Sequence, residues 1–470
     1  MGTTNAAAPK LRLRDVKGYL RRAPFRIPFK FGPSTITRAE ILHLWAEIGF
    51  DDGRPGAGIT ASPLAPVWFD KDPGRDPAET TRRLLRSVRI AADALAAAGP
   101  DTAYGLHRAV YDGVRRACLA EGMNGLTAGF GIALLDSVLV DAVCRRTGRS
   151  LHEALAGGLL GWTAPPGILP DRPLSRIFVR HTVGGLDPIT AADNPKPVGD
   201  GLPETLEEVV RVHGVRYVKA KVFADAGASL DRLRRIAAVL DASGVDYRVT
   251  LDGNESFAAM EDAEAFVRRA TEDPALKKFW GRVLWLEQPV DRKAALDAGV
   301  AGPLARIDAV LPVIIDESGD APDALPAALA LGYRGITAKH CKGIFHSLSN
   351  FAWIAEMIRK RPGRYRFSSE DLTNVPVVPL HQDTAVVAAL GIPHSERNGH
   401  HFLGALDYLP PRERADLLRR FPSAYAALPD GRLVLAVRDG AIAVDEINRF
   451  GYGSTSEPDW NSMETVELQR

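Results

Sequence analysis

The chain has few cysteines and no long apolar run. Its 470 residues include three cysteines, Cys118, Cys144 and Cys341, whose spacing fits no metal-binding motif. This small, odd number excludes a disulfide framework and predicts a reducing, cytoplasmic compartment. No uninterrupted apolar stretch approaches the ~18 residues of a membrane-spanning helix, and the polar N-terminal residues lack the apolar core of a signal peptide. We therefore expect a soluble protein with no membrane partner.

An excess of charge of one sign is also missing. The 59 lysines and arginines and the 58 aspartates and glutamates leave a formal net charge of +1. Such a balance gives no bulk field that favours nucleic acid as a partner. Hydrophobic residues make up 46% and charged residues 25% of the chain, values that exclude disordered, collagen-like and coiled-coil classes. These exclusions favour an enzyme that acts on a small molecule.

The first third of the sequence predicts an α+β domain. Residues 1–11 are polar and rich in alanine, and we expect a loose terminus there. Strand-like composition follows up to Phe50, interrupted at Gly32 and Pro33. Apolar residues then recur at helical spacing in three segments that each end near a glycine, at 76–99, 102–122 and 129–146. We place the boundaries of this domain at 12–160.

Strand-like and helical segments alternate over residues 161–410. Apolar strands that are each followed by a helix are typical of a parallel sheet covered on both faces. Eight of them within about 220 residues favour a (β/α) barrel over an open sheet. The strand candidates are 176–184, 216–223, 247–255, 283–289, 310–318, 333–340, 365–371 and 392–397. The remaining segment, 411–470, contains a strand–Asp–Gly–strand pattern at 431–444 that predicts a hairpin, and we expect it to pack back on the N-terminal domain.

Three of the strand candidates end in carboxylates. Asp252, Glu287 and Asp316 are 35 and 29 residues apart, each about one strand–helix unit. Barrel active sites are built where the carboxyl ends of the strands meet, so the three acids are expected to converge. Converging carboxylates repel one another unless a cation neutralises them, and an all-oxygen ligand set with open positions suits Mg²⁺. The alternative is that each acid only caps the following helix.

Lysines occupy strands beside these acids. Lys219 and Lys221 flank Ala220 and therefore point to the same face of the second strand, where two cations are out of place in a packed core. Each lysine, next to the other and to a metal, is expected to have a lowered pKa that suits a base. Lys339 ends the sixth strand, which lies opposite the second in an eight-stranded barrel. The alternative is an exposed edge strand with two solvated lysines.

These residues suit the abstraction of a proton α to a carboxylate. Negative charge then develops on the carboxylate oxygens, and a divalent cation stabilises it as a Lewis acid. The Lys219 ammonium adds to this stabilisation. Lys221 and Lys339, on opposite sides, can remove a proton from one face of the carbon and return one to the other face.

Taken in order, the motifs resemble those of the enolase superfamily. The set comprises K-x-K at 219–221, D-x-N at 252–254, E-x-P at 287–289, D-E-S at 316–318 and Lys339. It is most similar to the muconate-lactonising-enzyme-like subgroup of the mandelate racemase/muconate lactonising enzyme family. The stretch GIALLDSVLVDAVCRRTG also resembles the last helix of the family's capping domain. The resemblance extends over nearly the whole chain.

The resemblance implies an α/β fold, a modified (β/α)7β TIM-type barrel with an N-terminal α+β capping domain, and Mg²⁺ as cofactor. It implies metal ligation by Asp252, Glu287 and Asp316, acid/base roles for Lys221 and Lys339, and electrostatic help from Lys219. It places Asn254 and Glu396 near the substrate, although a surface salt bridge is an alternative for Glu396. The segments 29–35 and 68–73 fall where the family has its two specificity loops.

We expect a racemase or epimerase of a carboxylate substrate, since two opposed lysines suit proton transfer between faces. A dehydratase of sugar acids or a cycloisomerase would use the same site. A third hypothesis is a non-catalytic barrel that keeps the metal residues. A homo-oligomer is possible, as for most soluble enzymes. His381 lies in a helical pattern and is expected to be structural, and we assign no role to Glu370, His400 or His401.

Overall fold

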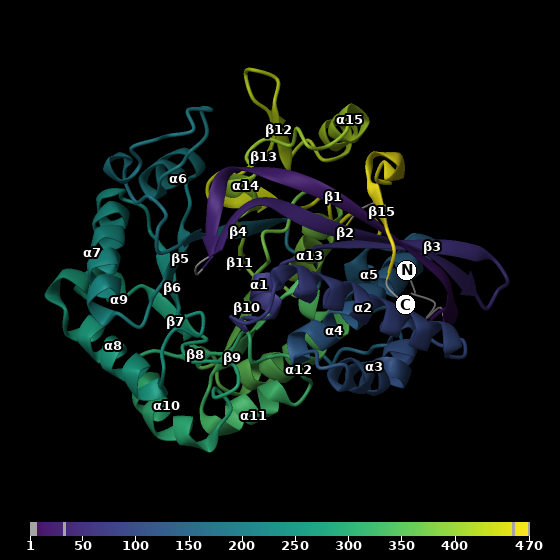
Figure 1. The fold of residues 1–470 in the computed structure, drawn as a ribbon, viewed down its shortest axis with the longest axis horizontal. Helices are drawn as coiled ribbons and strands as arrows, with labels where there is room; N and C mark the ends of the chain where they lie inside the picture. Colours follow the sequence, from purple (N-terminus) through teal and green to yellow (C-terminus); the bar gives the residue numbers. More distant parts are fainter. Residues whose placement is uncertain (1–6, 32–33, 454–455, 469–470) are drawn as a thin grey trace.

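The N-terminal domain is built on an antiparallel sheet (Figure 1). The computed structural model describes residues 7–31, 34–453 and 456–468. β1 (Leu11–Phe31) and β2 (Ser34–Phe50) pair along most of their length, and β3 (Pro55–Pro63) pairs with the other edge of β2. The predicted break at Gly32 and Pro33 falls between β1 and β2, outside the described residues.

Long helices occupy the three predicted places: two pack on the sheet, and the middle one packs on the other two. The helices of the domain are α1 (Pro66–Phe69), α2 (Pro77–Ala97), α3 (Ala103–Ala120), α4 (Gly125–Thr147) and α5 (Leu151–Ala156). The side chains of Asp76, Thr102 and Asn124 cap the three long helices, because each accepts a hydrogen bond from a backbone N–H of the first turn. Gly148 ends α4 with a φ of 64°, a conformation that glycine adopts readily.

α4 is the central helix of this domain. It is apolar on all sides and buried along nearly its whole length. By length and composition it could cross a membrane, but a core helix has the same properties. It lies so close to β3 that a Cβ at Gly58 would be 2.1 Å from the carbonyl oxygen of Val138. A glycine is therefore needed at this contact.

Eight parallel strands form the second domain, at the eight predicted places. They are β4 (Arg176–Val183), β5 (Tyr217–Lys221), β6 (Arg248–Asp252), β7 (Val283–Glu287), β8 (Val313–Ile314), β9 (Gly335–Ala338), β10 (Arg366–Ser369) and β11 (His394–Glu396). Ladders run from β11 through β4, β5, β6 and β7 to β8, and another ladder joins β9 to β10. An isolated bridge between Ile315 and Ile336 connects β8 to β9.

The strand order is that of a (β/α) barrel. No backbone ladder joins β10 to β11 within the described ranges, but Ser395 Oγ donates a hydrogen bond to Ser369 Oγ across this gap at 3.0 Å. Helices follow the strands and surround them (Figure 1). These helices are α6 (Leu206–His213), α7 (Ala226–Ala242), α8 (Met260–Glu272), α9 (Lys277–Trp280), α10 (Ala301–Asp308), α11 (Ala324–Leu331), α12 (Ile344–Lys360) and α13 (Val378–Ala389).

The C-terminal segment contacts both domains. It follows α14 (Gly399–Phe402) of the barrel domain and contains α15 (Pro411–Arg420), β12 (Tyr425–Ala427), β13 (Leu433–Leu435), β14 (Ala441–Ala443) and β15 (Glu464–Val466). β15 pairs with β1, and Gly18 lies opposite Val466 in this ladder. In contrast, β14 pairs with the barrel strand β4.

The hairpin predicted at 431–444 is confirmed only at its turn, where Arg438 and Ala441 form an isolated antiparallel bridge. Asp439 and Gly440 do form a tight turn, with φ values of 50° and 74°. However, β13 pairs with β12 and β14 pairs with β4. β5 pairs only with the half of β4 from Arg180 onward, which leaves the edge at Arg176–Phe178 free for β14.

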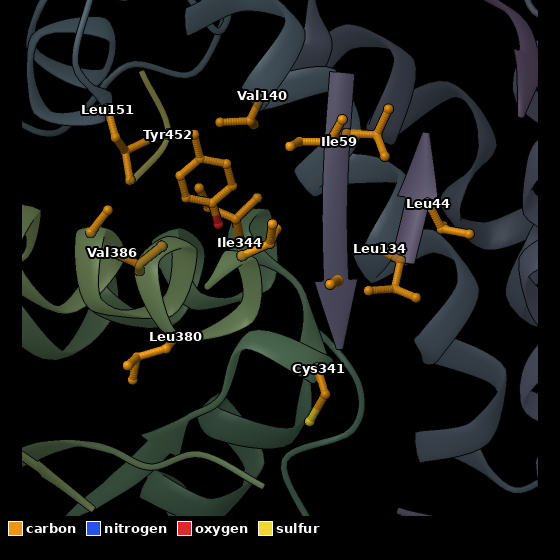
Figure 2. Packing of buried hydrophobic residues seen from close by; sticks show 14 of the residues in the cluster. Leu44, Ile59, Leu134, Val140, Leu151, Cys341, Ile344, Leu380, Val386 and Tyr452 are labelled. Carbon is orange, nitrogen blue, oxygen red and sulfur yellow. The ribbon is translucent and has the colours of Figure 1, made fainter. Parts of the chain in front are cut away.

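A shared hydrophobic interface holds the two domains together. Figure 2 shows side chains of this cluster, among them Ile59 of β3, Leu134 of α4 and Ile344 of α12. Polar contacts add to it, because Gln382 of α13 donates a hydrogen bond to the carbonyl of Ile59 at 2.8 Å and accepts one from Thr60 at 2.7 Å. β3 is thereby fixed relative to the barrel.

Candidate active site

The barrel strands bring the predicted acids to one rim. Asp252, the last residue of β6, is the ladder partner of Glu287, the last residue of β7. Lys221, the last residue of β5, pairs with Asp252 from the other side. Asp316 follows β8 by two residues. The three acids are at most 1% exposed, so they are not simple solvent-facing helix caps.

A fourth acid lies at the same rim. Glu370 directly follows β10, and ligand oxygens of Asp252, Glu287 and Glu370 lie within 4.8 Å of one another. Arg180 of β4 holds Glu370, since its Nη2 donates a hydrogen bond to Oε1 at 3.0 Å. From the sequence we assign no role to Glu370. The rule that selected the other acids, a carboxylate at the end of a barrel strand, would have found it.

Lys219 lies among the carboxylates. Its Nζ is 2.7 Å from Asp252 Oδ2, 3.2 Å from Glu287 Oε2 and 2.9 Å from Glu396 Oε2, and it also donates a hydrogen bond to Glu370. Burial lowers the pKa of Lys219, but these four carboxylates outweigh burial and raise the pKa well above its usual value. The expectation of a lowered pKa is therefore wrong for Lys219, which is a cation that neutralises the acid group.

The acid/base candidates Lys221 and Lys339 line the same cavity from different sides. Lys221 Nζ donates hydrogen bonds to Asp252 Oδ2 at 2.6 Å and Asn254 Oδ1 at 2.7 Å. Lys339 Nζ is 2.7 Å from Asp316 Oδ2 and 3.2 Å from Glu370 Oε2. Their strands, β5 and β9, are four places apart in the order of eight, and so lie on opposite sides of the barrel.

The charge on Lys339 is stabilised as on Lys219. Burial lowers the pKa of Lys339, but the charges of Asp316 and Glu370 raise it well above its usual value. Lys342 is a second partner of Asp316, with Nζ at 2.8 Å from Oδ1. Asp316 is therefore held by two ammonium groups, and it is not part of the close group formed by Asp252, Glu287 and Glu370.

The two candidate substrate-binding residues also lie at this rim. Glu396, the last residue of β11, accepts hydrogen bonds from Thr182, Asn398 and Lys219 and is only 6% exposed. Burial raises the pKa of Glu396, but the nearby lysines lower it by more than burial raises it. Its pKa therefore lies below the usual value. Asn254 receives the Lys221 hydrogen bond. Glu396 thus makes interior contacts rather than a surface salt bridge.

The acid group has the chemistry of a site for a hard divalent cation. Its donors are all buried carboxylate oxygens, and Glu287 Oε2 and Glu370 Oε2 accept no hydrogen bond from the described residues. Burial and the charge of Glu370 raise the pKa of Glu287 well above its usual value, and they outweigh the Lys219 ammonium, which lies 3.2 Å from Glu287 Oε2. An added divalent cation would relieve this repulsion, so the residues fit such an ion.

A cavity of about 720 Å³ opens above these residues. Its floor includes Lys221, Asp252, Lys339, Glu370 and Glu396 from the barrel. Its walls come from the β1–β2 hairpin and from the segment between β3 and α2. Both predicted loop regions thus contribute, through Phe29 and Thr35 of the first and Trp68 of the second. A cavity of this size is typical of small-molecule sites.

The solved structures that are similar to this chain include enzymes. The chain aligns with a muconate lactonizing enzyme from Pseudomonas fluorescens complexed with muconolactone at 18% identity and a TM-score of 0.59, covering 96% of this chain and 98% of that one. It also aligns with a dipeptide epimerase from Cytophaga hutchinsonii complexed with Mg and a dipeptide. The identity is 15%, the TM-score is 0.60, and the alignment covers 97% of this chain and 99% of that one. No family model and no curated protein sequence matches the chain.

A third similar structure is an enolase from Bradyrhizobium complexed with magnesium and mandelic acid, with 17% identity, a TM-score of 0.59 and coverage of 96% and 97%. Identities this low establish the fold and leave the reaction open. The predicted fold is confirmed: the chain has the α/β barrel with an N-terminal capping domain that mandelate racemase/muconate lactonizing enzyme structures have.

Proposed function

We propose that the protein is a Mg²⁺-dependent racemase or epimerase that moves a proton between the two faces of a carbon next to a carboxylate. The observation that carries this proposal is the placement of Lys221 and Lys339, four strands apart, beside a buried acid group and in one cavity. Structures of the same fold include epimerases. These facts support the proposal without fixing the substrate.

In this proposal Asp252 and Glu287 hold the metal, with Asp316 as the third ligand that the resemblance implies. When bound, a divalent cation supplies Lewis-acid stabilisation of the charge on the substrate carboxylate. The Lys219 ammonium, held by four acids, adds a fixed positive charge at the same place.

The lysine pair carries the proton transfer. The Cα–H bond of one enantiomer breaks, and the neutral amine of one lysine accepts the proton while the electron pair moves into the carboxylate group. Because the charges of Asp316 and Glu370 raise the pKa of Lys339, its neutral form requires that a bound divalent cation offset those carboxylates. The ammonium of the other lysine then donates its proton to the opposite face, which forms a new Cα–H bond. The reverse reaction exchanges the two roles. Each lysine must therefore reach the α-carbon from its own side.

A second function on the same site is cycloisomerisation or dehydration, in which one lysine removes the proton and a leaving group departs. The structural similarity to muconate lactonizing enzymes supports this alternative. Product analysis separates the two functions, because recovery of a stereoisomer contrasts with ring formation or loss of water.

Incubation with chiral carboxylic acids in D₂O tests the main proposal. We expect deuterium at the α-carbon, detected by NMR, only when Mg²⁺ is present. Lys278→Ala is the control for substitutions of Lys221 and Lys339. Lys278 is a solvent-exposed lysine that pairs with Asp241 away from the cavity. Absence of exchange for the wild-type protein with every acid of a broad library would overturn the proposal.

A further inference from the structure

The cavity above the acid group has two different halves. The floor is charged, as described above, whereas the walls from the N-terminal domain are mainly apolar. The apolar wall residues are Phe25, Phe29, Ile36, Leu64, Val67 and Trp68. A ligand that fills this space therefore meets charge at one end and hydrocarbon at the other.

The charged residues around the cavity already have partners. At the upper wall, Arg38 Nη2 lies 2.9 Å from Glu40 Oε1. At the side, Asp371 lies 3.0 Å from the buried Arg397. Arg38 is 57% exposed, but the charge of Glu40 balances it, so the described lining residues of the upper half offer no excess positive charge to a second carboxylate of a ligand. Burying an unpaired charge there would be costly.

The apolar walls are held in place by packing. Phe29 is the ladder partner of Ile36, and its ring packs edge-on against Phe402 of α14 with centroids 4.7 Å apart. Trp68 packs edge-on against Phe69, and Phe69 packs edge-on against Phe130 of α4, each pair with ring centroids 5.1 Å apart. The hairpin wall is thus anchored to the barrel, and the α1 wall to the neighbouring helices, before any ligand binds.

One apolar wall begins directly beside a catalytic candidate. Lys339 Nζ lies 4.6 Å from the centre of the Trp68 ring, a cation–π contact. A substrate whose α-carbon is within reach of Lys339 therefore places the substituent on that carbon next to the indole. The first atoms of the substituent meet an aromatic surface rather than a polar group.

We propose that the substrate is a monocarboxylic acid whose α-carbon carries a neutral, apolar group of about the size of an aromatic ring. This inference rests on the proposed function, since the acid group and lysines define which end binds the carboxylate. A second charged group on the substrate, as in a dicarboxylic acid, has no partner in the upper half of the cavity. The apolar group gains about fourfold in kcat/KM for each CH₂ that it buries.

Matched pairs of substrates test the inference. The test compares the α-proton exchange of acids with Mg²⁺ in D₂O. We expect kcat/KM for 3-phenyllactate to exceed that for lactate at least tenfold, and kcat/KM for phenylalanine to exceed that for alanine at least tenfold. The first pair are 2-hydroxy acids and the second pair are 2-amino acids. Malate and aspartate, with a second carboxylate, are expected to react most slowly. Exchange that is fastest for the charged acids would overturn the inference and leave the proposed function standing.

A binding measurement separates the two proposals when turnover is absent. Calorimetry with Mg²⁺ and the achiral acids 3-phenylpropionate and succinate, which yield no stereoisomer, measures binding to the cavity directly. Tighter binding of 3-phenylpropionate by at least tenfold supports the inference even if no acid exchanges its proton. Equal binding of the two acids, or tighter binding of succinate, overturns it.

The Ile36→Arg variant tests which wall is responsible. A guanidinium beside Phe29 is expected to lower phenylpropionate affinity at least tenfold and to raise succinate affinity. Val212→Arg is the control, because Val212 is 53% exposed on α6 and does not line the cavity. Unchanged preference in Ile36→Arg, with circular dichroism showing a folded protein, overturns the assignment of this wall.

Discussion

Lys339 Nζ lies 2.7 Å from Asp316 Oδ2, in a buried ion pair between the lysine of the sixth barrel strand and the acid predicted as the third metal ligand. Lys342 holds the other oxygen of the same carboxylate at 2.8 Å. A divalent cation at Asp316 would compete with both ammonium groups. Metal binding and the freedom of Lys339 to act on a substrate are thus coupled through one carboxylate.

The identity of the third metal ligand can be tested by substitution. We expect Asp316→Asn to weaken Mg²⁺ binding at least tenfold, because the variant loses a charged donor. Glu370→Gln is expected to weaken it less, since Glu370 Oε1 is already bound by the Arg180 guanidinium, which stays protonated. Thermal unfolding at increasing Mg²⁺ measures this, because an ion at 100 times its Kd stabilises the folded state by about 2.7 kcal/mol.

Asp252→Asn is the reference variant, since Asp252 belongs both to the ligand set implied by the resemblance and to the close acid group. It should abolish the Mg²⁺-dependent stabilisation. A larger loss for Glu370→Gln than for Asp316→Asn would show that the three acids grouped in the structure are the ligands.

The two lysines are expected to differ in stereochemistry. Lys221→Ala and Lys339→Ala should each lower racemisation by a factor of 10²–10⁴, the usual contribution of a general acid or base. Each variant should still exchange the α-proton of the one enantiomer whose proton faces the remaining lysine. Chiral chromatography combined with NMR in D₂O measures both quantities. Loss of exchange for the same enantiomer in both variants would contradict a pair of lysines on opposite faces.

The sequence predicts the fold well because its signals are local and repeated. Eight apolar strands at regular spacing, and helices with polar caps such as Asp76, define the elements without knowledge of tertiary contacts. The end of each barrel strand then defines the rim, and that rule is sufficient to bring Asp252, Glu287 and Lys221 together. The pairing of β14 with β4 escapes this reasoning, because a free edge on β4 is visible only in three dimensions.

The charges of the site are harder to predict. The pKa of Lys219 depends on how many carboxylates its ammonium reaches, and those four acids come from four different strands. Two of them, Glu370 and Glu396, are distant from Lys219 in sequence and carry no motif of their own. Lys342 likewise reaches Asp316 only because the turn after Lys339 folds back toward β8.

Buried histidines are expected to make the protein sensitive to acid. Burial lowers the pKa of His43, His346 and His381 to about 3. Between pH 6.5 and 3 the unfolded chain binds a proton at each of these residues, while the folded protein does not. Stability is therefore present above pH 6.5 and falls as the pH decreases, by up to about 1.4 kcal/mol per pH unit and histidine. Urea unfolding between pH 7 and 5 measures this slope.

His381→Gln removes one titrating group while keeping an amide that can reach Tyr425, whose hydroxyl lies 2.7 Å from His381 Nε2. The unfolding free energy of the variant should fall less steeply as the pH decreases, because unfolding of the variant takes up one proton fewer. An unchanged slope would mean that the pKa of His381 is the same in the folded and unfolded states.

Arg180 is expected to contribute to stability through Glu370. Both side chains are fully buried, and burial, which alone would raise the pKa of Glu370, is outweighed by Lys219, Lys339 and Arg180, which lower it to about 2. Arg180→Met would remove one partner of a buried charge, a change that typically costs about 3–5 kcal/mol. Urea unfolding tests this against Arg248→Met, which removes an exposed arginine paired with Asp246 and should cost at most about 1 kcal/mol.

The double variant Arg180→Met/Glu370→Gln separates the pair from the packing of the arginine. If weaker charge compensation of Glu370 causes the loss, neutralising Glu370 should recover part of the stability that Arg180→Met removes. Lys219 and Lys339 lose Glu370 as a partner in the double variant but keep their other carboxylates. Additive losses in the double variant would instead assign the effect to the hydrogen bonds that Arg180 donates to Ser368 and to the Ser369 carbonyl.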